Sequence, residues 1–280
     1  MNLPSMQRLL RQLRKQLKDF PCDPDPRAVH RLRSRIRQVQ AFADAGLDCS
    51  QKSKRSLDAV RKCAGRLRDL DVFTENIQTL PQDLGAESIA RLQRRLRKDH
   101  KQSSRSLEKV LARHRKPARR ALSEFARQIR HASASSASLQ EKDDSGTLAE
   151  QARHQVVEFR KEITRWSEPD EENLHSLRKN IKTLRTLLQL MPESDPAEIR
   201  ILGTAASRIG QWHDWQRLAS LAYKSLDDSR DSLLLGQIAR TVDIHLEHAI
   251  QTAASLRVHY PKPVRPESDT ARSMHLARSA

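Results

Sequence analysis

Two stretches of this chain, VHRLRSRIRQVQAF at residues 29–42 and LHSLRKNIKTLRTL at residues 174–187, share one pattern. Each opens with an apolar residue and a histidine, His30 or His175, and continues with cations and aliphatic residues at helical spacing. The two histidines lie 145 positions apart, from 30 to 175. This pattern predicts a pair of equivalent amphipathic helices, one in each half of the chain.

The same offset of 145 positions relates residues well beyond the two quoted stretches. It aligns Arg55, Leu57, Gly65 and Asp69 with Arg200, Leu202, Gly210 and Asp214. No insertion or deletion is needed between the histidine-bearing stretch and the stretch with the glycine and the aspartate. Chance would have to align both stretches at one offset. We therefore interpret the chain as an internal duplication.

Each copy of the repeat separates into an apolar face and a cationic face on a helical wheel. In the first copy the apolar residues are Val29, Leu32, Ile36 and Val39, and the facing polar residues are His30, Arg33 and Arg37, flanked by Arg31 and Arg35. In the second copy the apolar residues are Leu174, Leu177, Ile181, Leu184 and Leu188. The facing polar residues are His175, Arg178, Lys179, Lys182 and Arg185. Like charges at this spacing repel by about a few tenths of a kcal/mol per pair. Together with the repeat, this favours an anion that neutralises them; a solvated helix face is the alternative.

The composition predicts an all-α protein, because glycine occurs only 7 times, aromatic residues make up 4% of the chain, and no alternating strand pattern is bounded by turns. Amphipathic helices in each half can bury their apolar faces only by packing as a bundle. We expect a first helical-bundle half over residues 1–131, a linker over 132–146, a second half over 147–260 and a disordered tail over 261–280. Pro117 is expected to begin a new helix, and residues 197–209 and 212–226 to form two helices.

The net charge of +17 is concentrated in the first half of the chain. Residues 1–131 contain 32 lysines and arginines against 14 aspartates and glutamates, whereas residues 132–280 contain 20 against 21. This imbalance indicates a polyanionic partner; a basic surface kept for solubility is the alternative. A further basic run at residues 91–98 fits a second wall of an anion site and a solvated helix face equally well.

No stretch approaches the roughly 18 apolar residues of a membrane span, and the basic N-terminal helix lacks the apolar core of a signal peptide. The three cysteines, Cys22, Cys49 and Cys63, lack metal-ligand spacing and fit free thiols in a reducing compartment. We therefore expect a cytoplasmic protein with no membrane segment, no metal site and no cofactor.

A few acidic residues and histidines have a catalytic and a structural interpretation. Asp69 is interpreted as a helix cap or charge partner rather than as a general acid or base. His213 and Asp214 form the dipeptide found in metal phosphohydrolases, but that class needs further spaced histidines. His245 and His248 could bind a metal, yet no third ligand stands at a recognisable spacing, which favours surface residues.

The paired motifs resemble the CHAD family, a histidine-bearing all-helical domain that binds inorganic polyphosphate. The family pattern is similar to V-H-x-L-R-K-x-I-R-R-L-R in each half, followed by L-G-x-x-R-D-L-D-V or a degenerate form of it. Here VHRLRSRIR and GRLRDLDVF fit the first half, and LHSLRKNIK and IGQWHDWQRL fit the second, so that the resemblance covers residues 3–258. It implies two pseudo-symmetric four-helix bundles around a central basic channel, and a domain that is not by itself a catalyst.

Carried over position by position, the resemblance assigns polyphosphate binding to eight residues: His30, Arg33, Arg37, His175, Arg178, Lys179, Lys182 and Arg185. Held among cations, the two histidines are expected to have lowered pKa values. The chain departs from the pattern at Ser34 and Gln40, which replace a lysine and an arginine. The first-half wall is therefore expected to bind less tightly than the family pattern implies.

The sequence thus predicts a non-enzymatic binding module whose partner is inorganic polyphosphate, free or in granules. Polyphosphate carries about one charge per phosphate and no bases, so an array of cations is sufficient to recognise it. The alternative is a nucleic-acid-binding protein; the few aromatic residues disfavour base stacking, but duplex binding through phosphates stays open. A phosphotransfer or hydrolytic enzyme using His30 or His175 would lack a glycine-rich phosphate loop and a positioned base.

Overall fold

The computed structural model describes residues 3–44, 51–81, 85–138, 148–165, 168–189, 191, 193–227 and 231–260. Its helices are α1 (Leu3–Lys18), α2 (Pro26–Asp44), α3 (Gln51–Gln78), α4 (Ala86–Ser138), α5 (Leu148–Arg165), α6 (Glu171–Leu188), α7 (Pro196–Ser225) and α8 (Ser232–His259). The described residues contain no strand, which confirms the all-α prediction. None of these helices is both long enough and apolar enough to cross a membrane.

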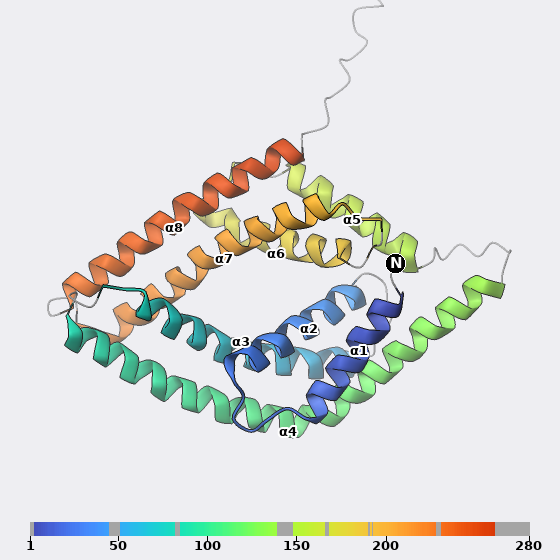
Figure 1. Ribbon diagram of the computed structural model, residues 1–280, viewed down its shortest axis with the longest axis horizontal. Coiled ribbons are helices and arrows are strands. Elements are labelled where there is room, and N and C mark those ends of the chain that lie inside the picture. The colour runs from blue at the N-terminus through green and yellow to red at the C-terminus, as the bar shows by residue number, and fades with distance from the viewer. Residues whose placement is uncertain are drawn as a thin grey trace, which may run out of the picture.

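The two repeat helices, α2 and α6, are neighbours in the middle of the molecule. Figure 1 shows α4 and α8 as the long outer helices, with α2, α3, α6 and α7 between them. Within each half, consecutive helices pack together: α2 on α3, α3 on α4, α6 on α7 and α7 on α8. Between the halves, α2 contacts α6 and α3 contacts α7. Residues that are 145 positions apart in the chain are thereby brought to one region.

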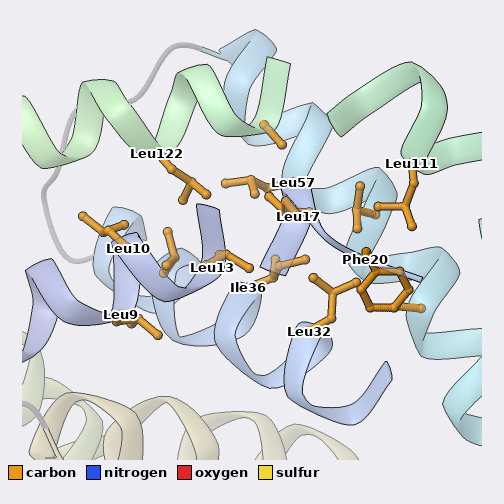
Figure 2. Close-up of a cluster of buried hydrophobic side chains, with 14 of the residues drawn as sticks. Leu9, Leu10, Leu13, Leu17, Phe20, Leu32, Ile36, Leu57, Leu111 and Leu122 are labelled. Carbon is orange, nitrogen blue, oxygen red and sulfur yellow. The ribbon is translucent and has the colours of Figure 1, made fainter. Parts of the chain in front are cut away.

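A first apolar core lies among α1, α2, α3 and α4 (Figure 2). The apolar face predicted for the first repeat helix is confirmed, since Val29, Leu32, Ile36 and Val39 are each at most 1% exposed. Burying an aliphatic side chain of this size contributes about 2 kcal/mol. This face holds α2 against its own half and leaves the arginine-bearing face directed away from the core.

A second apolar core lies among α5, α6, α7 and α8. Here too the predicted apolar face is buried, with Leu174, Leu177, Ile181, Leu184 and Leu188 each at most 3% exposed. A capping box sets the beginning of α6: the Asp170 side chain accepts a hydrogen bond from the backbone N–H of Asn173 at 2.8 Å, and the Asn173 side chain accepts one from the backbone of Asp170 at 3.1 Å. The cationic residues of α6 follow from this start.

A third apolar cluster joins the two halves. It combines the end of α3 and the start of α4 with the end of α7 and the start of α8, and includes Leu70, Phe73, Ile77, Leu92, Trp215, Leu218, Leu234 and Ile238. Beside it, the buried carboxylate of Asp231 accepts hydrogen bonds from Ser88 and Arg91 of the first half. The two halves therefore share apolar and polar contacts, while the pseudo-twofold relation between them stays a prediction.

Two predicted helix breaks are wrong. α4 continues through Pro117, because Leu111, Ala118 and Leu122 are buried on both sides of the proline and offset its cost of roughly 3 kcal/mol. α7 likewise continues through Gly210, between the buried side chains of Ile209 and Trp212.

The linker predicted over 132–146 is helical as far as Ser138, where α4 ends. Its remaining residues, the predicted tail at 261–280 and Cys49 lie outside the described residues. Cys22 and Cys63 are free thiols, the first exposed and the second buried.

Candidate functional site

Helices α2 and α6 border a hollow of about 530 Å³. Residues of α2, α3 and α6 line it, together with Gln189, which follows α6 directly. Nearly all of them are polar: His30, Arg33, Ser34, Arg37, Gln38, Gln40, Ala41, Arg61, Lys179, Lys182, Thr183, Arg185, Thr186 and Gln189. The lining holds six arginines and lysines and no carboxylate. A concave surface of one sign of charge concentrates anions.

Most of the predicted site residues meet in this hollow. Three come from α2 and three from α6: His30, Arg33, Arg37, Lys179, Lys182 and Arg185. The remaining two, Arg178 and His175, are not part of the lining, but both lie within electrostatic range of Lys182. The structure thus brings the cationic faces of both repeat helices to one place.

Two arginines lie against glycines that occupy matching positions of the repeat. A Cβ atom at Gly65 would stand 3.4 Å from Nε of Arg33, and a Cβ atom at Gly210 would stand 2.9 Å from Nη2 of Arg178. Because glycine has no side chain, each guanidinium can approach the neighbouring helix closely. The two repeated glycines therefore make room for arginines, which explains why they occur inside continuous helices.

The Nε–H groups of Arg178 and Arg185 are buried and have no hydrogen-bond partner among the described residues. Buried donors in folded proteins are nearly always paired with an acceptor. These two donors beside the cationic hollow are available to an acceptor from outside the protein.

Burial and mutual repulsion lower the pKa values of three cations in the hollow, Arg33, Arg37 and Lys182. The pKa of Lys182 falls to about 7, first because of burial and then because of Arg178 and Arg37. The pKa of Arg37 falls to about 10, again mainly through burial, with Arg33 and Arg178 as further causes. Arg37 keeps its proton at neutral pH, whereas Lys182 is divided between its charged and neutral forms. An anion in the hollow would favour the charged form.

Two carboxylates at matching positions of the repeat, Asp69 in α3 and Asp214 in α7, interact electrostatically with the arginines of the site. Asp69 accepts a hydrogen bond from Arg217, which also lies over the ring of Phe73 at 5.8 Å. Burial raises the pKa of Asp214, and Arg178 opposes that shift. Asp69 lies well inside α3, so its role as a charge partner is confirmed and its role as a helix cap is wrong.

The two repeat histidines have lowered pKa values, as predicted. Burial is the largest cause for both, followed by Arg68 for His30 and by Lys179 for His175. The ring of His175 lies 5.0 Å from that of His213, whose pKa falls to about 4 mainly through burial. The main cause differs from the predicted one, because burial lowers these two pKa values more than the surrounding cations do.

Arg61 is a cation of the hollow that the sequence analysis did not identify. Its counterpart in the repeat is Ala206, so the duplication does not mark it. A different signal was present: Arg61 precedes Gly65 by four residues and Asp69 by eight on α3, which places all three on one helical face.

The basic run at residues 91–98 forms ion pairs and is not part of this hollow. Arg91 pairs with the buried Asp231 and, at 3.1 Å, with Glu87, and Arg95 pairs with Asp99 at 2.8 Å. Of the two interpretations left open for this run, a charged structural face is favoured.

The histidines considered as metal ligands make ring contacts instead. His245 stacks on Trp215 at 6.0 Å, and His248 meets His245 edge to face at 6.4 Å. Within the described ranges, no group of three or more histidine, cysteine, aspartate or glutamate side chains is arranged to hold a metal ion.

Comparison with known proteins agrees with this arrangement of helices. The family model described as the CHAD domain matches residues 5–222. The crystal structure of the CHAD domain from the plant Ricinus communis is similar, with a TM-score of 0.58 and 16% sequence identity, over 94% of this chain and 86% of that one. At that identity the likeness shows the fold alone. No curated protein matches the chain.

Proposed function

This chain belongs to the CHAD domain family, which is associated with polyphosphate binding in general, and on that premise we propose that the hollow between α2 and α6 binds inorganic polyphosphate. The phosphates contact the eight residues of the repeat, together with Arg61. The protein acts as a binding module, without catalysis.

The observation that carries this proposal is the set of half-buried cations from both repeat helices with no carboxylate in the lining. Holding like charges at this depth costs folding free energy, because burial and repulsion both disfavour the charged forms. A flexible polymer with about one negative charge per phosphate can neutralise several of them at once and release its counterions. Orthophosphate reaches only a few of the cations.

Nucleic acid is the second candidate, since its backbone carries the same phosphate charge. The lining of the hollow contains no tryptophan, tyrosine or phenylalanine on which bases could stack. Its volume of about 530 Å³ also suits a single narrow chain better than a duplex with bulky bases. These features support polyphosphate over nucleic acid.

The experiment that tests the proposal is a binding titration with long-chain polyphosphate, orthophosphate and duplex DNA at one fixed salt concentration. We expect polyphosphate to bind at least about tenfold more tightly than either competitor, and its affinity to fall steeply as salt rises. Equal affinity for orthophosphate and long polyphosphate would contradict the proposal. Tighter binding of duplex DNA would favour the nucleic-acid alternative.

A further inference from the structure

A second hollow of about 590 Å³ lies next to the first, on the outer face of α7. It is lined mainly by Arg185, Arg200, Thr204, Ser207, Arg208 and Gln211. Arg185 lines both hollows. Within the described part of the chain, Arg185, Arg200 and Arg208 form no ion pair, and the lining contains no carboxylate.

Arg185 is positioned as a link between the two hollows. It is half-buried, and its Nε–H has no partner among the described residues. Its guanidinium lies against Gly203, where a Cβ atom would stand 3.2 Å from Nε and Cζ. The absence of a side chain at position 203 therefore lets the Arg185 guanidinium lie against α7, where it borders both hollows.

The polar residues of the second hollow form one strip along α7. Positions 200, 204, 207, 208 and 211 recur at helical spacing on one face. Arg200 and Arg208 are about 12 Å apart along the helix axis, with the hydroxyls of Thr204 and Ser207 between them. The Thr204 hydroxyl donates to the backbone carbonyl of Arg200 at 3.2 Å. The donors that remain for a linear chain of phosphates are Arg200, Ser207, Arg208 and Gln211.

The first half keeps only part of this pattern: Arg55 matches Arg200, and Lys62 and Arg66 stand at the positions of Ser207 and Gln211. Gln40 replaces Arg185, Cys63 replaces Arg208, and Asp58 stands at the position of Gly203. The Asp58 carboxylate accepts a hydrogen bond from Arg61 Nε at 3.1 Å and lies 2.8 Å from Lys62 Nζ. At this position of the repeat the first half therefore carries a carboxylate that is ion-paired with two cations, whereas the second half has a glycine.

The hollow at the other end of the first site is also less favourable for an anion. His30 lines this hollow as well as the first one. Arg27, Arg31 and Arg68 also line it, but so do the carboxylates of Asp25 and Glu75. Arg68 donates to Glu75 at 3.0 Å, so part of the positive charge is already neutralised.

We propose that a polyphosphate chain too long for the first hollow leaves it past Arg185 and continues over α7 along Arg200 and Arg208. This inference rests on the proposed function and extends it: the polyphosphate chain is bound asymmetrically, on the side of the second half. Affinity then increases with chain length beyond what the first hollow accommodates. Tripolyphosphate, which is confined to the first hollow, does not reach α7.

The test compares Arg200→Ala/Arg208→Ala with a matched control, Arg55→Ala/Arg66→Ala. All four side chains are exposed on helices, so both variants lose two positive charges and are expected to stay folded, as circular dichroism can check. Each variant is titrated with long-chain polyphosphate and with tripolyphosphate. We expect the α7 variant to lose about tenfold in affinity for the long chain and less than about twofold for tripolyphosphate. The control should stay within about twofold of the parent for both ligands.

Equal weakening by the two variants would overturn the inference, because it would reveal a general charge effect. So would an α7 variant that binds the long chain like the parent. Failure of the proposed function gives a different result, in which the parent itself shows no preference for polyphosphate. Substitution of Arg178 and Lys182 separates the two cases, since it should weaken both ligands if the first hollow is the site.

Discussion

At the level of single residues, the site depends on missing side chains as well as on charges. Arg33, Arg178 and Arg185 each lie against a glycine of the neighbouring helix. The closest approach is at Gly210, where a Cβ atom would stand 2.9 Å from Arg178. Contacts this short require the arginine to shift.

Gly210→Ala is therefore expected to displace Arg178 and to lower polyphosphate affinity about fivefold, or roughly 1 kcal/mol. Helix stability should not suffer, because alanine is the better helix former. Gly236→Ala is the control, since a Cβ atom there would have nothing within 4 Å. Titration of both variants checks the prediction, and equal affinities for the two would contradict it.

Lys182 illustrates the conflict between function and stability. In the unfolded chain it binds a proton up to its ordinary pKa of 10.5, whereas in the folded protein it does so only below about pH 7. The free energy of unfolding therefore rises with pH between these values. The free-energy penalty of holding a charged amine in the folded protein is fully present below about pH 7. Removing the amine removes the penalty.

Lys182→Met is expected to raise the melting temperature by about 2 °C or more at neutral pH while weakening polyphosphate binding. The gain should shrink when melting curves are repeated at about pH 9.5, because the parent has then lost most of its penalty. Lys179→Met, at an exposed position, is the control and should change the melting temperature little at either pH. A gain for Lys182→Met that is independent of pH would refute this account.

The histidines link binding to proton uptake. The pKa values of His30 and His175 are lowered in the free protein, and a bound polyanion would raise them. Binding should therefore strengthen as the pH falls from 8 towards about 6. NMR titration of the imidazole resonances with and without polyphosphate measures the shift, and unchanged pKa values for both would remove the histidines from the mechanism.

At the level of helices, α6 and α2 contribute unequal numbers of charges to one hollow. α6 contributes Lys179, Lys182 and Arg185 to the lining, whereas α2 contributes Arg33 and Arg37 and has Ser34 and Gln40 at two of the matching positions. The apolar faces of both helices are buried separately from these residues. Charges can thus be removed from either helix without loss of core packing.

Replacement of Arg178, Lys179 and Lys182 by alanine should lower polyphosphate affinity at least about tenfold and make its salt dependence shallower. Arg33→Ala/Arg37→Ala should have the same effect but a weaker one. Arg94→Ala/Arg97→Ala/Lys98→Ala, at exposed positions of α4, removes three charges outside the hollow and should leave affinity within about twofold of the parent. If the α4 variant were the one to lose binding, the site would lie along that helix instead.

At the level of the whole molecule, the third apolar cluster couples the two halves. Leu234 of α8 is fully buried in this cluster, while its neighbour Leu233 is 67% exposed. Both halves contribute side chains to this cluster, so a loss of packing here destabilises both halves. The two halves should therefore unfold together.

Leu234→Ala is expected to cost about 2–5 kcal/mol and to lower the melting temperature of the whole chain in a single calorimetric transition. Leu233→Ala, the exposed neighbour, should cost less than about 0.5 kcal/mol. Two separate transitions, of which only one moves in Leu234→Ala, would show that the halves fold independently.

Much of this architecture follows from local pattern. The helical class and the buried faces of α2 and α6 could be predicted, because the periodicity of a helix determines which residues share a face. Six of the eight predicted site residues line the hollow, and the role of all eight in binding stays a prediction. The lowered pKa of the repeat histidines was predicted in direction as well. The helix breaks predicted at Pro117 and Gly210 are wrong, because a local helix breaker is outweighed when apolar residues on both sides of it are buried.

The contacts between distant segments could not be predicted in this way. Nothing in the repeat marks Arg61 as part of the hollow, and nothing local shows that Gly203 lies against Arg185. The joining of α3 and α4 to α7 and α8 in one apolar cluster is equally invisible along the chain. Side-chain periodicity specifies which face of a helix is apolar, but not which other helix covers it. That choice depends on how all eight described helices pack together, and it is this packing that sets the cationic faces of α2 and α6 against each other.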